Sequence, residues 1–215
     1  MKSLNFKQLV YCFTAFAIAL CAFRIFKTNQ FSYFFLIWNL FLALIPWWVS
    51  EYLKTKNKLQ LKHIPLVFAW LLFLPNAPYI LTDLFHLRQR TDIPLWFDLV
   101  LILSFAFTGL VVFMKSLKDM LIVFKHYLSP FYHRVFTFGV FWLISFGLYL
   151  GRYVRFNSWD VIHPVGFMKT CLRLFIHEQS LKEVSAFTCV FSAFLMMVFF
   201  VINHKPGEGK ETAKY

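Results

Sequence analysis

Acidic residues, glycine and cysteine are scarce in this chain of 215 residues, which has 10 Asp and Glu, 7 Gly and 4 Cys. The spacing of the cysteines matches no zinc site, and we expect buried free thiols. Few glycines, and no segments that alternate apolar with polar residues, exclude a transmembrane β-barrel. The net charge of +12 comes without any nucleic-acid recognition motif, so it does not indicate a nucleic-acid-binding protein.

Apolar residues are abundant instead: 60% of the chain is hydrophobic, 21% is aromatic, and the mean hydropathy is +0.62. A soluble domain of this size would expose a very large apolar surface. Six stretches predict membrane helices, at residues 9–23, 31–49, 64–81, 95–114, 131–150 and 184–202. We expect an all-α polytopic membrane helix bundle, with one integral membrane domain over residues 1–204 and a polar tail over 205–215.

The positive charges predict the orientation of this bundle. Six spans place both termini on one side of the membrane, and that side carries the larger share of the 22 Lys and Arg. The positive-inside rule therefore predicts cytoplasmic termini. Before the last span, residues 167–176 have apolar residues at helical spacing with Lys169 and Arg173 between them. This pattern predicts an amphipathic helix in the membrane interface.

The third span contains a proline-rich break. Pro75 removes a backbone donor and clashes with the preceding turn, and Pro78 disfavours a helical conformation at Ala77. We expect Asn76 to cap a segment that restarts at Pro78. The third helix is then broken, and its second piece begins inside the membrane. A simple proline kink is the alternative.

One charged pair follows the break in the third span, and another lies at the end of the fifth span. Asp83 and His86 are three residues apart on one predicted helix face, where they can bind a metal or act as a general base. Arg152 and Arg155 have the same spacing and suit an anionic group such as a lipid phosphate. A structural cluster and nonspecific contact with lipid phosphates are the respective alternatives. Asn39, a lone amide in the second span, predicts an interhelical hydrogen bond.

The region after Arg155 adds further polar candidates. Asn157 is expected to end the fifth helix, and Asp160 to support the start of the next one. Asp160 and His163 also repeat the spacing of Asp83 and His86. The topology places seven polar residues at the outer membrane surface, which predicts a shared pocket formed by Asp83, His86, Asp98, Arg152, Arg155, Asn157 and Asp160.

Two sequence blocks resemble the signatures of domain-of-unknown-function family 1361. The first is the run 74–79, followed by Thr82-Asp83 and His86-Leu87, and the second comprises Gly151-Arg152, Arg155 and the run 157–160. That family consists of predicted multi-pass bacterial membrane proteins of about this length. The resemblance implies a bacterial cytoplasmic membrane location and supports the choice of site residues, Asn76 and Tyr79 included. It implies no activity.

Three functions fit these predictions. The first is a membrane enzyme at the outer leaflet, with Asp83, His86 and Asp160 as catalytic residues and Asp83 and His86 as possible metal ligands. Its anionic or lipid-phosphate substrate would be bound by Asn76, Tyr79, Arg152, Arg155 and Asn157. The second is a non-catalytic subunit whose polar cluster is structural or binds a partner, and the third is a small carrier or channel. The expected partners are the lipid bilayer and an anionic lipid or small anionic ligand at the outer face, and no nucleic acid is expected. The sequence does not identify a cofactor or a protein partner.

Overall fold

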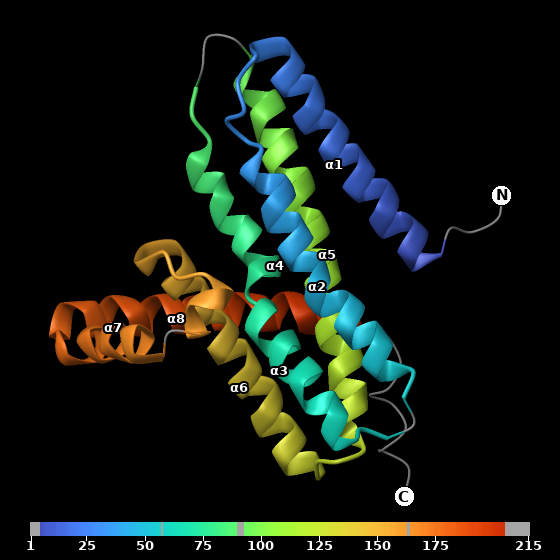
Figure 1. The fold of residues 1–215 in the computed structure, drawn as a ribbon, viewed down its shortest axis with the longest axis vertical. Helices are drawn as coiled ribbons and strands as arrows, with labels where there is room; N and C mark the ends of the chain where they lie inside the picture. Colours follow the sequence, from blue (N-terminus) through green and yellow to red (C-terminus); the bar gives the residue numbers. More distant parts are fainter. Residues whose placement is uncertain (1–4, 57, 90–92, 163, 205–215) are drawn as a thin grey trace, which may run out of the picture.

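Long apolar helices form nearly the whole fold in our computed structural model, which describes residues 5–56, 58–89, 93–162 and 164–204. The described residues contain no strand (Figure 1). Their elements are α1 (Phe6–Thr28), α2 (Phe35–Lys54), η1 (Leu61–His63), α3 (Ile64–Phe73), α4 (Asn76–Tyr79), η2 (Ile80–His86), α5 (Leu95–Lys125), α6 (Pro130–Tyr149), η3 (Leu150–Val154), η4 (Ser158–Ile162), α7 (Pro164–Ile176) and α8 (Glu178–Asn203).

Among the described residues, six helical stretches are long and apolar enough to cross a membrane, which confirms the predicted membrane helix bundle. They are Phe6–Thr28, Phe35–Lys54, Leu61–His86, Leu95–Lys125, Pro130–Val154 and Glu178–Asn203. Five of them reach at least as far at both ends as the stretch predicted from the sequence, whereas α2 begins at Phe35 rather than at residue 31 and continues to Lys54. The predicted tail over residues 205–215 lies outside the described residues.

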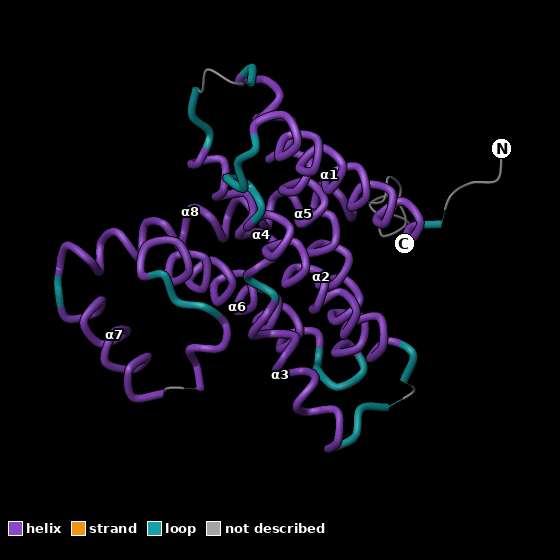
Figure 2. The backbone as a smooth tube through the Cα atoms, turned by 45° about the horizontal axis from the view of Figure 1, so that its top comes forward, coloured by secondary structure: helices purple, strands orange, loops and turns teal. Residues whose placement is uncertain are grey.

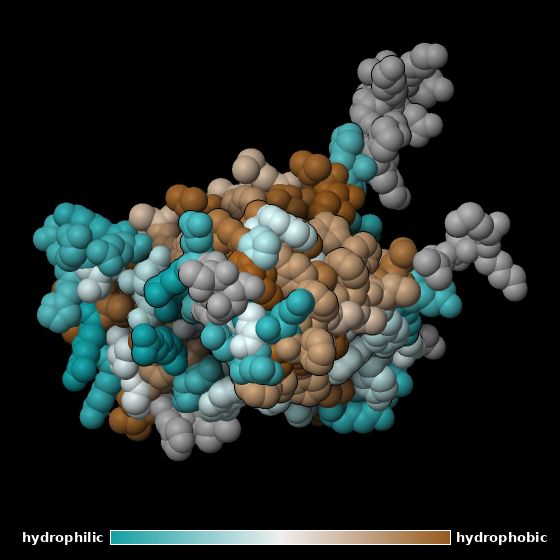
Figure 3. Space-filling model, turned by 90° about the horizontal axis from the view of Figure 1, so that it is seen from above, coloured by the Kyte–Doolittle hydropathy of each residue, from teal (hydrophilic) through white to brown (hydrophobic). Residues whose placement is uncertain are grey.

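The 31-residue α5 is the central helix of the bundle. It packs against α1, α2, α4 and η2, and the views in Figure 1 and Figure 2 place it beside α1 and α2. Apolar side chains also cover much of the outside, and Phe107, Trp142 and Phe200 are among those exposed. Hydrophobic residues form a large part of the face shown in Figure 3. Such a surface is stable only against hydrocarbon, as expected for helices that contact lipid.

The third span is broken where the sequence predicts it. Helix α3 ends at Phe73, a short α4 follows, and η2 continues as a 3₁₀-helix to His86. The predicted start at Pro78 is wrong, because α4 already begins at Asn76. Asn76 does not cap this helix: its side-chain amide donates hydrogen bonds to neighbouring segments instead.

Glycines let neighbouring helices approach this break closely. A Cβ atom at Gly109 of α5 would lie 2.7 Å from the carbonyl oxygen of Ala77, and one at Gly147 of α6 would lie 2.9 Å from Cγ of Pro75. Neither distance leaves room for a side chain. The broken segment therefore packs closely between α5 and α6, with the Ala77 carbonyl against Gly109 and the Pro75 ring against Gly147.

The fifth span ends in an irregular turn. After α6 the chain forms the π-helical turn η3, and Arg155 then adopts the left-handed conformation with φ 63° and ψ 32°. The expectation that Arg152 and Arg155 share one helix face is therefore wrong, because the helix ends between them. Arg155 is exposed, whereas the Arg152 side chain is only 14% exposed.

Helices α7 and α8 run across the vertical axis of Figure 1, and α8 packs against α6. Helix α7 is the amphipathic helix expected before the last span, with Val165, Met168 and Leu172 exposed. All four cysteines are free. The prediction that they are buried is wrong for Cys12 and Cys189, which lie on outward faces of α1 and α8, while burial raises the pKa of the half-buried Cys171 thiol and keeps it protonated.

Candidate functional site

A cavity of about 500 Å³ lies between α2, the broken third span, α6 and α7. Most of its walls are apolar, with Leu42, Phe146 and Phe167 among the lining residues. Trp38 and Phe68 also line it, yet these side chains are 51% and 58% exposed on the outside of the bundle. The cavity therefore opens sideways, onto the surface that would contact the hydrocarbon of a bilayer.

Polar side chains line part of this cavity: Asn76, Tyr79, Asn157 and Ser158 from the two sequence blocks, and Asn39 from α2. The Nδ2 atom of Asn76 donates hydrogen bonds to the Phe73 carbonyl and to Oγ of Ser158, each at 2.9 Å. Oγ of Ser158 in turn donates to the Leu72 carbonyl at 3.1 Å. These bonds join η4 to the end of α3, where the break has freed backbone carbonyls from helical partners.

A buried carboxylate, Asp83, is the centre of a second group that we call the Asp83 cluster (Asn39, Asp83, His86 and Arg152). Asp83 is 1% exposed, and its Oδ2 accepts a hydrogen bond from Nδ2 of Asn39 at 2.9 Å. Its Oδ1 lies 3.6 Å from Nη1 of Arg152 and 3.8 Å from Nδ1 of His86. These distances exceed hydrogen-bond length, and Oδ1 has no hydrogen-bond partner among the described residues.

The cluster confirms two expectations. Asp83 and His86 do share a face, and Asn39 does make an interhelical hydrogen bond, from α2 to η2. Arg152 reaches the carboxylate from η3, and its guanidinium also lies over the Phe85 ring, 5.1 Å from the centroid. One buried carboxylate thus holds together three elements that are far apart in the sequence.

The single shared pocket predicted from the sequence is divided in the structure. Asn76, Tyr79 and Asn157 line the cavity, whereas Asp83, His86 and Arg152 belong to the Asp83 cluster behind its wall. Asn39 belongs to both groups. Among the other members, Arg155 is exposed, and Oδ2 of Asp160 accepts a hydrogen bond from the Asn157 backbone N–H at 2.6 Å, which supports the start of η4 as expected.

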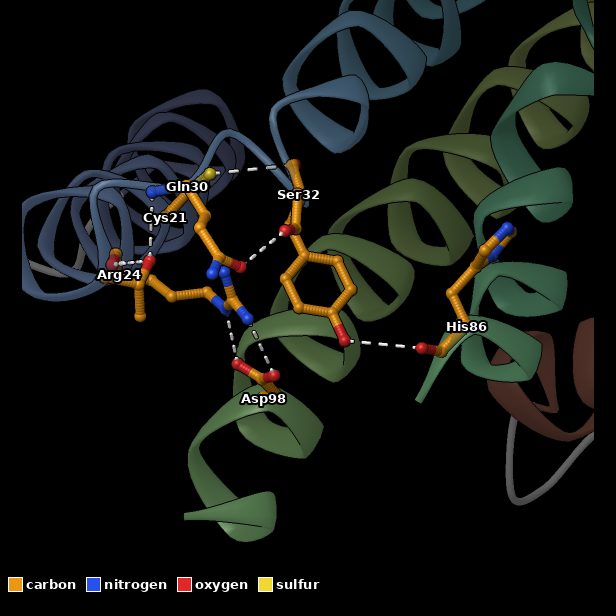
Figure 4. A network of polar contacts seen from close by, with 8 residues as sticks. Cys21, Arg24, Gln30, Ser32, His86 and Asp98 are labelled. Carbon is orange, nitrogen blue, oxygen red and sulfur yellow. Dashed lines mark hydrogen bonds and ion pairs between the residues drawn. The ribbon is translucent and has the colours of Figure 1, made fainter. Parts of the chain in front are cut away.

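Asp98 belongs to a separate buried network at the junction of α1 and α5, shown in Figure 4. Arg24 Nε lies 2.7 Å from Oδ1 of Asp98, and Nη2 lies 3.2 Å from Oδ2. The guanidinium stacks 4.4 Å from the Tyr33 ring centroid, and the Tyr33 hydroxyl donates to the His86 carbonyl at 3.3 Å. Sequence reasoning missed this pairing, which joins residues 74 positions apart.

Few of the described side chains are placed to bind a metal ion together. Within the described ranges no group of three or more His, Cys, Asp or Glu side chains is placed to hold an ion. Asp83 and His86 would supply two ligands, so the metal prediction rests on these two alone. His163, the partner suggested for Asp160, lies outside the described residues.

Sequence reasoning also missed the apolar cavity walls. Gly147 and Gly151 are four residues apart, a spacing of small residues that permits close helix contact in membranes. A Cβ at Gly151 would lie 3.2 Å from the Tyr79 ring, so both glycines face the broken span. This spacing is the one signal in the sequence that could have located the contact between the two blocks.

Comparison with known proteins agrees with the two sequence blocks. No curated protein and no solved structure matches the chain. Residues 38–198, which contain the cavity and the Asp83 cluster, match a family described as proteins of unknown function, DUF1361. The match covers most of the chain, so this protein is a member of the DUF1361 family.

Proposed function

We propose that this chain is an amphiphile-binding membrane protein, which takes the hydrocarbon part of a lipid into its cavity and contacts the headgroup with the polar lining residues. The observation that carries this proposal is the sideways opening: exposed Trp38, Phe68 and Leu143 line the cavity as well as the outer surface. A lipid molecule could enter through this opening without leaving the hydrocarbon region. The volume of about 500 Å³ also lies within the usual range of small-molecule sites.

The polar lining suits a headgroup. Asn157 carries an amide that can donate and accept, and the Tyr79 hydroxyl makes no hydrogen bond to any described residue. In the orientation we propose, a bacterial cytoplasmic membrane with both termini in the cytoplasm, these groups lie in the outer half of the bilayer. Arg152 and the exposed Arg155 do not line the cavity, but they precede Asn157 by only five and two residues, so an anionic headgroup is the favoured class.

Catalysis by Asp83 is a second candidate, favoured by the unpartnered Oδ1 beside His86, whose side chain is 47% exposed. A general base needs an acceptor atom within reach of the substrate. Asp83 does not line the cavity, so a substrate would have to approach it from the His86 side. Under this candidate, Asp83→Asn abolishes turnover of a lipid phosphate while lipid binding persists.

Filling the cavity tests the binding proposal. Leu71 lines the cavity, and Leu71→Trp should occupy part of the volume that the hydrocarbon needs. Leu103→Trp is the matched control, because Leu103 of α5 is 43% exposed and is not among the cavity residues. Native mass spectrometry of protein purified in mild detergent would measure retained lipid.

We expect Leu71→Trp to lower lipid retention by about tenfold or more, an affinity loss of about 1.4 kcal/mol. The control should retain lipid as the unmodified protein does, and both variants should elute as folded protein in size-exclusion chromatography. Equal retention in both variants would contradict the proposal.

A further inference from the structure

A second cavity, of about 380 Å³, lies where α2 is joined to α3, far along α2 from Asn39 (the lower end of the bundle in Figure 1). We call it the basic pocket. Its lining residues are Tyr52, Lys56, Lys58, Gln60, Lys62 and His63. No acidic residue is among them, which distinguishes this cavity from an ordinary mixed-charge surface.

The three pocket lysines have no acidic partner in the described part of the chain. The nearby acids are already engaged: Glu51 pairs with Lys7 at 2.9 Å, and Asp119 accepts from Lys54 at 2.6 Å and also from Lys115. The positive charge around the pocket is therefore uncompensated. Because like charges held together raise the electrostatic free energy, such an arrangement favours a bound anion.

Two contacts organise the pocket. Nζ of Lys56 lies 4.2 Å from the Tyr52 ring centroid, a cation–π distance that restricts the lysine. His63 is 5% exposed, and its Nδ1 accepts a hydrogen bond from the Gln60 backbone N–H at 3.0 Å. In the neutral ring this leaves the proton on Nε2, so the imidazole offers an N–H donor.

We propose that the basic pocket binds a phosphate group, carried by an anionic lipid headgroup or present as free phosphate. The positive-inside rule accounts for lysines in this connection but not for their convergence with His63 around one cavity. Lysine clusters next to a membrane helix attract anionic lipids. This proposal is independent of the lipid cavity described above, because the two share no lining residue.

The test compares two triple variants of the full chain that remove the same charge from the same end of the bundle. One replaces the pocket lysines (K56Q/K58Q/K62Q), and the control replaces exposed cations that do not line the pocket (K118Q/K125Q/R134Q). Native mass spectrometry measures retention of phosphatidylglycerol against phosphatidylcholine, and isothermal titration calorimetry measures binding of inorganic phosphate. Size-exclusion chromatography confirms that all proteins are folded.

We expect about fivefold weaker binding per pocket lysine, on the order of 100-fold for the triple variant, with the control changing far less. Loss of phosphatidylglycerol retention identifies a lipid headgroup as the source, and loss of calorimetric phosphate binding identifies free phosphate. The proposal is overturned if both triple variants lose binding equally, which would indicate general electrostatics. It is also overturned if the unmodified protein retains phosphatidylglycerol no better than phosphatidylcholine and does not bind inorganic phosphate.

Discussion

The buried pair between Arg24 and Asp98 leads to a quantitative prediction about stability. Their side chains are 1% and 2% exposed, and the guanidinium makes two contacts with the carboxylate. Arg24→Met removes the cation but keeps much of the apolar volume. The carboxylate of Asp98 would then remain buried without a charged partner.

The expected cost follows from the asymmetry of buried ion pairs. Removing one partner of such a pair typically costs about 3–5 kcal/mol, because the remaining charge is desolvated and uncompensated. Replacing both partners with apolar groups of similar size is often neutral or stabilising. We therefore expect Arg24→Met to be strongly destabilising, and the double variant R24M/D98L to recover most of the loss.

Unfolding by sodium dodecyl sulfate in mixed micelles, followed by far-UV circular dichroism, would give the free energies for this double-mutant cycle. Lys182→Met is the control, because Lys182 pairs with Glu178 while their side chains are 69% and 81% exposed. Such an exposed pair should contribute well under 1 kcal/mol. The reasoning is refuted if Arg24→Met costs no more than the control, or if R24M/D98L is less stable than either single variant.

Three further substitutions test the packing around the site by the same unfolding assay. Gly147→Val should cost about 1–3 kcal/mol by overpacking, because its Cβ would lie 2.9 Å from Cγ of Pro75. Asn76→Leu should cost about 1–3 kcal/mol, because it removes the part-buried donor to Ser158 and to the Phe73 carbonyl. Trp70→Phe should cost about 1 kcal/mol, because it removes an indole N–H that donates to a buried hydroxyl of α5 at 3.0 Å.

Leu103→Ala, on the exposed side of α5, is the common control for these substitutions. Its side chain is 43% exposed, so its effect should be smaller than that of any of the three. A Gly147→Val protein as stable as the control would show that the broken span can move away from α6.

Periodicity and composition predicted the membrane spans and the break in the third span, because these features depend on local sequence. Apolar length fixes where a helix can cross the bilayer, and Pro75 acts on the turn that contains it. Asn39 was predicted correctly as an interhelical donor because an amide in hydrocarbon needs a partner. The identity of that partner, Asp83, did not follow from the sequence.

Contacts between side chains far apart in the sequence could not be predicted, because spacing along the chain does not show which helices pack together. The ion pair between Arg24 of α1 and Asp98 of α5 is one such contact. The expectation for Arg152 and Arg155 failed for a local reason, because the π-helical turn and the left-handed Arg155 end regular helical spacing. The cavity, like the ion pair, could not be predicted, because its walls depend on how α6 packs against the broken span and on the position of Phe167 of α7.

The glycine contacts of the broken span have a consequence for how the cavity would select a ligand. Pro75 and Gly147 both line the cavity, and they pack so closely that the wall between the broken span and α6 has little free volume. We expect affinity to rise with hydrocarbon chain length until the cavity is filled and then to level off, because the sideways opening lets a longer chain extend into the bilayer.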